Sequence, residues 1–378
     1  IYFSLKQRRR TKGGTEDYFL GGHRMPVWAV AFSILATAQS AATFVGVPES
    51  AYTGDLTYLS SNIGGILAAI LLARIFIPAY YKLGVVTPYQ LLETRFGPGA
   101  RVVASFSYMV GRVFAGGARL FIGALPFSMI VFGDISLPNI LISLVVFTIF
   151  GILYTLWGGI SSVIWTDVIQ VSVYFGAAIS AIIVLLYLIP VSPGEILSAL
   201  HHPPNDAPSK LTVVKTGIDL NEPYLGFNPA TSYTLFTAVF GFSLLTLASH
   251  GADQDLVQRM LTCKSARKGS WSVISGVLIG VPVVLVFLIQ GLLLYIFYQR
   301  PDVMGAAAPT YATPASNELA MTFSMREMPA GLAGFMLAGL LAAGPCGINS
   351  SLNAMSSTFV SDFYRNFRPG RSDRHYVH

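Results

Sequence analysis

The chain has 378 residues, of which 53% are hydrophobic and only 11% are charged. Average soluble domains carry roughly 25% charged residues, so this composition predicts an integral membrane protein. The net charge of +6 does not indicate nucleic-acid binding, because the basic residues fall in short segments between apolar runs instead of along one face. The two cysteines, Cys263 and Cys346, are too few for a disulfide framework or a zinc cluster, and we expect both to be free thiols.

The first residues are the apolar stretch IYFSL followed by the basic stretch KQRRRTK. A signal peptide has the opposite order, with its charges before the apolar run. The observed order is typical of the end of a membrane span and its cytoplasmic flank. We therefore expect the sequence to be a fragment that starts after a first helix. The basic end RPGRSDRHYVH predicts a cytoplasmic loop with further helices beyond it.

Apolar runs long enough to cross about 30 Å of hydrocarbon predict eight membrane spans. Their approximate ranges are 27–47, 59–81, 102–132, 139–157, 163–189, 232–252, 272–298 and 330–361. Most of the 24 Lys and Arg fall in every second connection, and such segments face the cytoplasm. This rule places the lead-in 1–26 inside and the long connections 190–231 and 299–329 outside. We expect a multi-pass protein of the plasma (inner) membrane.

The stretch 31–48, AFSILATAQSAATFVGVP, combines an apolar pattern with hydroxyl and amide groups, and it ends on Gly46 and Pro48, which weaken a helix. In hydrocarbon each unpaired polar group costs several kcal/mol. One explanation is a discontinuous membrane helix whose freed carbonyls and hydroxyls hold a cation or a small solute. The other is a helix of small residues whose Ser and Thr bond back to their own backbone. This stretch alone leaves both explanations open.

Residues 240–254, FGFSLLTLASHGADQ, form a second polar interruption, in a span that enters the membrane from the opposite side. Two interrupted spans of opposite direction, five helices apart, are the pattern of an inverted repeat. We therefore predict one all-α transporter domain over 1–378. Its first repeat would hold five spans at 27–189, and the first three spans of the second, inverted repeat would lie at 232–361.

Three ionisable residues fall inside predicted spans. Asp167 lies about one turn into the fifth span, where it is either part of an ion path or an interfacial acid at a helix start. Arg112 and Arg119 lie seven residues apart on one helix face. They either pair with an acid or line a cavity for an anionic solute, and the alternative is that they snorkel from a tilted helix.

The last predicted span is rich in small residues and also carries side-chain oxygens, at Asn349, Ser350, Ser351 and Asn353. Close helix packing explains the small residues, but it explains the two asparagines less well. The sequence contains no Gly-rich Lys-Ser/Thr phosphate loop, and no catalytic constellation stands out. We therefore expect neither an enzyme nor an ATP-driven pump, and no organic cofactor. The expected partners are the solute and the membrane lipid, with no nucleic acid and no obligate protein partner.

Four stretches together resemble the sodium:solute symporter family, which includes sodium–glucose, proline, iodide and sialic-acid symporters. They are DYFLGGHRMPVWAVAFSILATAQSAATFVGVP, LYTLWGGISSVIWTDVIQ, DQDLVQRMLTCKSARKG and the Ala-Ala to Asn-Ala-Met run of the last span. The resemblance implies a five-plus-five inverted-repeat fold of the LeuT type, truncated at both ends here, with one extra helix before the repeat. It also implies symport of a small polar organic solute with Na+ by alternating access.

The resemblance further implies two cation sites. The principal sodium site would use backbone carbonyls near Ala36, Gln39 and Ala343 and the side chains at Cys346 and Gly347. Here the sequence departs from the family, because a thiol is a poor ligand for a hard cation and glycine has no side chain. A second cation site would fall at Asp167, Asn349 and Ser350, which all offer oxygen ligands. The driving ion is therefore Na+ by resemblance, and a proton-coupled or uncoupled transporter, or a solute sensor of the same fold, is the alternative.

Solute contacts implied by the resemblance are small and neutral. They fall at Thr43, Asn62, Gly65, Thr246 and Ser249. Such a set predicts a small polar solute but does not choose among a sugar, an amino acid and a carboxylate.

Overall fold

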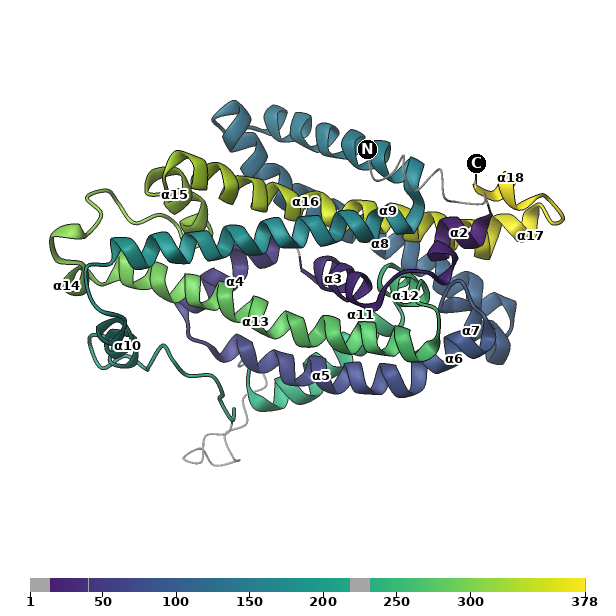
Figure 1. Ribbon diagram of the computed structural model, residues 1–378, viewed down its shortest axis with the longest axis horizontal. Helices are drawn as coiled ribbons and strands as arrows, with labels where there is room; N and C mark the ends of the chain where they lie inside the picture. Colours follow the sequence, from purple (N-terminus) through teal and green to yellow (C-terminus); the bar gives the residue numbers. More distant parts are fainter. Residues whose placement is uncertain (1–13, 40, 218–231, 378) are drawn as a thin grey trace.

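The computed structural model describes residues 14–39, 41–217 and 232–377, and most of these residues are helical (Figure 1). Short helices gather at the two ends of the molecule. One end carries α10 (Pro193–His201), α14 (Pro301–Met304) and α15 (Leu319–Arg326), and the other carries α2 (Thr15–Leu20), α7 (Tyr89–Phe96), α17 (Arg365–Phe367) and α18 (Asp373–Val377). The two predicted outer connections therefore contain helices of their own.

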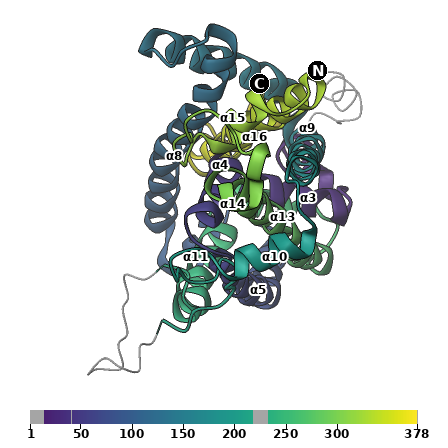
Figure 2. The ribbon, with the colours of Figure 1, turned by 90° about the vertical axis from the view of Figure 1, so that its left-hand side faces the viewer.

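The body between these ends is a bundle of long helices. Its members are the run of α5 (Ser61–Leu71), η3 (Leu72–Phe76) and α6 (Ile77–Leu83), and the helices α9 (Leu137–Leu188), α13 (Ala266–Gln299) and α16 (Ala330–Thr358). A further long helix, α8 (Pro98–Phe132), lies at the edge of the bundle (Figure 2). This position explains why α8 is the least buried of the long apolar helices.

By length and composition, four helices within the described residues can cross a membrane. They are Thr57–Leu83, Pro98–Met129, Gly159–Leu188 and Ala266–Gln299. The segments Thr15–His23 and Val27–Ala38, bent by 110° relative to each other, make a fifth if they count as one span. The topology of eight spans and the repeat boundaries stay predictions.

The predicted spans 139–157 and 163–189 are the two parts of α9, which bends at Gly159. This residue has φ 54° and ψ −161°, a combination that side chains disfavour. A Cβ at this position would also lie 2.5 Å from the carbonyl oxygen of Tyr18 in α2. Glycine is therefore required here both by the bend and by the close approach of the N-terminal segment.

The first predicted interruption is a break in the helix, but its position differs from the expectation. Helix α3 (Val27–Ala38) ends at Gln39, which has extended dihedrals, and α4 (Ala41–Thr53) follows. The expected weakening at Gly46 and Pro48 was wrong, because α4 continues through both residues. Tertiary packing supports this part of α4: a Cβ at Gly291 would lie 2.1 Å from the Pro48 carbonyl oxygen, so the backbone of α13 packs directly against α4.

The second predicted interruption is also displaced along the chain. The π-helix η4 (Thr237–Gly241) leads into α11 (Phe242–Gly251), and the helix breaks at Ala252 and Asp253 before α12 (Gln254–Leu261). Most of the predicted interruption 240–254 is therefore helical, and the break lies close to its end. Asp253 has extended dihedrals, and its side chain accepts a hydrogen bond from the N–H of Asp255, which is the geometry of a helix N-cap.

Helix α13 forms much of the hydrophobic core, packing against both α4 and α9. The ring of Phe287 stacks on Tyr174 of α9 with centroids 5.5 Å apart, and it meets Phe44 of α4 edge-on at 5.4 Å. Such aromatic pairs add to the apolar burial of their side chains. The core therefore fixes α4, the helix that follows the first break, against two long helices.

Candidate functional site

Helices α3 and α11, each of which ends at one of the two breaks, line one small cavity, here called the central cavity. Its walls come from α3, from the segment Tyr58–Gly65, from α11 and from α13, and its volume is about 150 Å³. Gln39 enters it from the first break, and His250 enters it near the end of α11. The volume lies below the roughly 300–1,000 Å³ of pockets for drug-sized ligands, so in this conformation the cavity matches a small solute.

Three of the five predicted solute residues line this cavity, namely Asn62, Gly65 and Thr246. The other two lie elsewhere: Thr43 is half-buried on α4, and the Ser249 hydroxyl donates to the Thr246 carbonyl at 3.2 Å. The structure thus brings α5 and α11 together as predicted, although residues 62 and 246 are far apart in the sequence.

His250 is a cavity residue that the sequence analysis did not select. It is buried, and its Nδ1 lies 2.9 Å from the Ser249 hydroxyl. Its position at i+4 from Thr246 on one helix face is the signal that could have identified it. With Gln39, Asn62 and Thr246 it supplies hydrogen-bonding groups within walls that are otherwise largely apolar, such as Leu35 and Val284.

The predicted principal sodium position falls where α3 ends. Ala36 is buried in the last turn of α3, and Gln39 is the residue at the break. The last turn of a helix presents its carbonyl oxygens at the helix end, which is the kind of ligand that the predicted site would use. The expected partners Ala343, Cys346 and Gly347 belong to α16, but their side chains lie outside the described residues. The expectation at this position stays a prediction.

The predicted second cation position is a buried polar cluster where α3, α9, α12 and α16 meet. Asp167 on α9 is 1% exposed, and Asn349 and Ser350 on α16 are fully buried. The Ser33 hydroxyl of α3 donates to Asp167 Oδ2 at 2.5 Å. The carboxylate and hydroxyl oxygens suit a hard cation such as Na+. Asp167 is therefore not an interfacial acid at a helix start.

A guanidinium from α12 already contacts this cluster. Arg259 Nη2 lies 3.0 Å from Asp167 Oδ2 and also donates to the Ser350 hydroxyl. Its Nε donates to the Ser33 hydroxyl at 2.8 Å, so all four helices are joined through one side chain. The oxygen atoms of Asp167, Asn349 and Ser350 fit a cation. In this conformation the guanidinium of Arg259 is the cation that neutralises Asp167.

Arg259 follows the predicted span 232–252, in a connection that the charge pattern places on the cytoplasmic side, where burial of an arginine is not expected. Arg259 is fully buried, as is Asp255, whose Oδ1 lies 3.2 Å from Arg259 Nη1. Spacing of i and i+4 on one helix is the signal that could have indicated this pair. The cost of burying a guanidinium is offset only by several charged and polar partners, which come from distant parts of the chain.

Arg112 also pairs with acids, as one of its two interpretations proposed. Its Nη2 contacts Asp255 Oδ2 and lies 3.3 Å from Asp253 Oδ2. Arg119, two turns further along α8, is half-buried and donates to the Thr37 carbonyl at 3.4 Å, next to the break in α3. The two arginines therefore approach both broken helices from the edge of the bundle.

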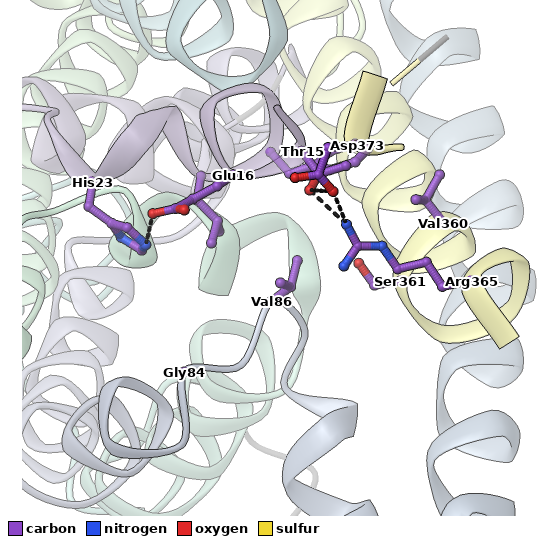
Figure 3. A pocket seen from close by; sticks show the side chains of 11 residues that line it. Thr15, Glu16, His23, Gly84, Val86, Val360, Ser361, Arg365 and Asp373 are labelled. Carbon is purple, nitrogen blue, oxygen red and sulfur yellow. Dashed lines mark hydrogen bonds and ion pairs between the residues drawn. The ribbon is translucent and has the colours of Figure 1, made fainter. Parts of the chain in front are cut away.

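A larger cavity of about 360 Å³ lies at the end of the molecule that carries α2 and α18 (Figure 3). Figure 3 shows Glu16 and His23 directed at each other, and His23 Nε2 lies 3.6 Å from Glu16 Oε1. Arg365 donates to Thr15 at 2.7 Å and to Asp373 at 3.0 Å. None of the predicted ion or solute residues within the described part lines this cavity. We therefore assign the central cavity, and not this one, as the candidate solute site.

Comparison with known proteins identifies the family. The profile of the sodium:solute symporter family matches residues 18–377. The chain belongs to this family. The predicted family is confirmed. Because this family consists of sodium-coupled transporters, the prediction of a transporter and not an enzyme is confirmed too.

Two curated relatives and one solved structure illustrate the similarity. The sodium/sialic acid symporter SiaT of Proteus mirabilis (strain HI4320) is 31% identical over 96% of this chain and 68% of its own length. The human sodium/iodide cotransporter is 28% identical over 93% of this chain and 51% of its own. The chain thus spans between half and about two thirds of these relatives. A substrate-bound, outward-open Na+-coupled sialic acid symporter has a TM-score of 0.81 and 27% identity, covering 100% of this chain and 74% of that one. This match confirms the predicted all-helical transporter fold.

The buried ion pair predicts a strong energetic coupling between Arg259 and Asp167. Arg259→Gln leaves two carboxylates with fewer buried partners and is expected to lower the free energy of unfolding by about 3–5 kcal/mol. Asp167→Asn in the same chain removes one of these carboxylates, so the double variant should lose less than the sum of the two single losses. Denaturant unfolding of the purified protein in detergent measures all four variants of the cycle. Additive losses would contradict the pairing.

The cavity walls predict different roles for two hydroxyls on α11. Thr246 lines the cavity, whereas Ser249 does not. Thr246→Val keeps the shape but removes the hydrogen-bonding group, and it should raise the solute concentration for half-maximal uptake about tenfold, the equivalent of one hydrogen bond of roughly 1.4 kcal/mol. Ser249→Ala is the matched control and should change this concentration less than threefold. Uptake into liposomes measures both, and equal effects would exclude the assigned cavity.

Proposed function

We propose that the protein is a symporter of the plasma membrane that uses the Na+ gradient to move a small polar solute inward by alternating access. The observation that carries this proposal is that α3 and α11, each of which ends at a helix break, line one cavity that holds several hydrogen-bonding groups. Broken membrane helices place backbone and side-chain polar groups at the middle of the bilayer, where an ion and a solute can bind. The relatives named above are sodium-coupled carriers of small solutes, which supports the same chemistry.

Ion and solute would be coupled through α3. One part of this helix, including Leu35 and Ala38, lines the cavity, while Ser33 contacts Asp167 in the buried polar cluster. The two regions are only a few residues apart on one rigid helix. A cation that draws α3 toward α9 and α16 would therefore also position the cavity wall, and differential binding of this kind is what shifts a conformational equilibrium.

For the solute itself we propose a small anion or a solute with an anionic group. Arg119 is half-buried, and its guanidinium reaches the Thr37 carbonyl beside the break in α3, adjacent to the cavity residue Ala38. A guanidinium recognises carboxylates strongly and selectively. The relatives named for sialic acid and for iodide support this choice, whereas a relative named for glucose, 24% identical, represents the neutral alternative.

An uncoupled or proton-driven transporter of the same fold is the second candidate. Two observations favour it: residues 346 and 347 are Cys and Gly, which make poor sodium ligands, and the Arg259 guanidinium contacts Asp167. In that case accumulation of the solute would not depend on a sodium gradient.

Transport driven by sodium predicts a specific defect on removal of the Asp167 charge. The full chain in liposomes should accumulate a labelled solute from a panel of sialic acid, lactate, iodide and glucose only with an inward Na+ gradient. Asp167→Asn should raise the Na+ concentration for half-maximal uptake at least tenfold, because the buried cluster loses its carboxylate. The control Asp302→Asn changes an exposed acid at the far end of the molecule and should behave as wild type. Equal accumulation with and without the gradient would support the second candidate instead.

Recognition of an anion predicts a selective effect of Arg119. Arg119→Gln should reduce uptake of the anionic members of the same panel about tenfold or more, while binding of any neutral solute changes less than threefold. Arg326→Gln, which alters an arginine that stacks on Tyr311 in the outer region, serves as the control. Uptake of glucose by the wild type, unaffected by Arg119→Gln, would contradict an anionic substrate.

A further inference from the structure

Helices α12 and α16 face each other through two pairs of polar side chains. Gln254 Nε2 donates to the Ser357 hydroxyl at 2.9 Å. Gln258 Nε2 donates to Asn353 Oδ1 at 2.8 Å. The two pairs are four residues apart on each helix, so they follow one face of α12 and one face of α16. All four side chains are at most 1% exposed. They form a continuous buried strip, here called the amide strip.

The amide strip begins at the buried polar cluster around Asp167. On α12, Gln258 directly precedes Arg259, and on α16, Asn353 lies three residues after Ser350. Arg259 and Ser350 both belong to the cluster, where the guanidinium donates to the Ser350 hydroxyl. Residues three apart are neighbours on a helix surface. Asn353 therefore follows the cation ligand predicted at Ser350 on the same side of α16.

The strip ends at the larger cavity of about 360 Å³, at the end of the molecule that is predicted to face the cytoplasm. The Phe19 carbonyl accepts from Gln258 Nε2 at 2.7 Å. The Val86 carbonyl accepts from Gln254 Nε2 at 2.9 Å. Phe19 and Val86 both line this cavity, as does Ser361, which follows the strip on the same run of helix (Figure 3). The strip therefore spans the region between the cluster and the cavity.

Each glutamine of the strip has a spare carbonyl oxygen. Gln254 Oε1 and Gln258 Oε1 have no hydrogen-bond partner among the described residues. The orientation of both amides is fixed, because rotation would bring Oε1 of Gln258 against the Phe19 carbonyl and Oε1 of Gln254 against the Val86 carbonyl. Buried acceptors without a partner are unfavourable. The two oxygens therefore indicate a ligand that they hold for at least part of the time.

We propose that the amide strip is the route by which the cation leaves the cluster toward the cytoplasm, with the oxygens of Gln254 and Gln258 as its ligands on the way. Amide oxygens suit a hard cation such as Na+, and a neutral ligand releases it more readily than a carboxylate does. From Ser350 to Ser361 the route covers about 16 Å along the helix axis. The inference rests on the proposed function, because it takes Na+ as the transported ion.

The same hydrogen bonds close the route in this conformation. Gln258 Nε2 holds both Asn353 of α16 and the Phe19 carbonyl of α2, so it joins three helices across the strip. Separation of α2 from α12 would break the bond to Phe19 and free the amide of Gln258 to turn toward the cation. We therefore assign Gln258 as the residue that both closes the route and serves the passing ion.

Net uptake and exchange, measured with the full chain in liposomes, separate release of the cation from the other steps. Net uptake requires the cation to leave inward in every cycle, whereas exchange of labelled for unlabelled solute at equal Na+ on both sides requires only release of the solute. Gln258→Leu should reduce sodium-driven net uptake about tenfold or more, because the ion loses an oxygen ligand, while exchange stays within about twofold of wild type.

Gln290→Leu is the matched control for this variant. Gln290 is also fully buried, and its amide also has no hydrogen-bond partner among the described residues, but it belongs to α13 and lies outside the strip. Its replacement should change neither net uptake nor exchange. Equal losses of both activities in Gln258→Leu, or wild-type net uptake, would overturn the route. A wild type without sodium-driven uptake would instead contradict the proposed function, and the route for Na+ with it.

A second measurement needs no solute and keeps the fold intact. Ser357→Cys places a thiol in the strip, and the cationic reagent aminoethyl methanethiosulfonate should label it faster than it labels the native cysteines of the wild type. Ala181→Cys is the control, because Ala181 is equally buried but lies in the hydrophobic core on α9. Equal labelling of the two variants would mean that cations do not enter the strip, and it would overturn the proposal.

Discussion

One buried guanidinium holds the central part of this protein together. Arg259 is fully buried and contacts Ser33, Asp167, Asp255 and Ser350, so it joins α3, α9, α12 and α16. Removing a guanidinium from water is expensive, and the cost is offset only while all of these partners are close. Any movement that separates the four helices must therefore give Arg259 new partners or admit a compensating ion. This requirement makes the cluster a natural place for a conformational equilibrium between two arrangements.

The two breaks in the helices give this cluster its connection with the solute cavity. The break at Gln39 ends α3 beside the cavity, and the break at Asp253 begins α12, which carries Arg259. Each break lies within a few residues of the solute cavity and of the polar cluster around Arg259. A small rotation at either break would thus alter the cavity walls and the charge pairing at the same time. This geometry offers a physical basis for coupling an ion to a solute in a sodium:solute symporter.

The helices around the two breaks are closely packed, so we expect a conformational change to bend the backbone mainly at the breaks. Helix α4 continues through Gly46 and Pro48 because α13 packs directly against it, with Gly291 at the Pro48 carbonyl and Phe287 against Phe44. A densely packed core of this kind resists gradual deformation. The positions at which the backbone departs from helical dihedrals are then the ones at which the molecule can bend.

The sequence by itself determined the membrane class, the family and the existence of two broken helices, because hydrophobic length, charge placement and polar interruptions are local properties of the chain. It also selected Asn62, Gly65 and Thr246, which do meet at one cavity, and the buried Asp167. Only the tertiary structure decided where each helix breaks, since packing of α13 outweighs the local tendencies of Gly46 and Pro48. It also decided that Arg259 and Asp253 belong to an internal network of ion pairs, because their partners Asp167 and Arg112 lie more than 90 residues away along the chain.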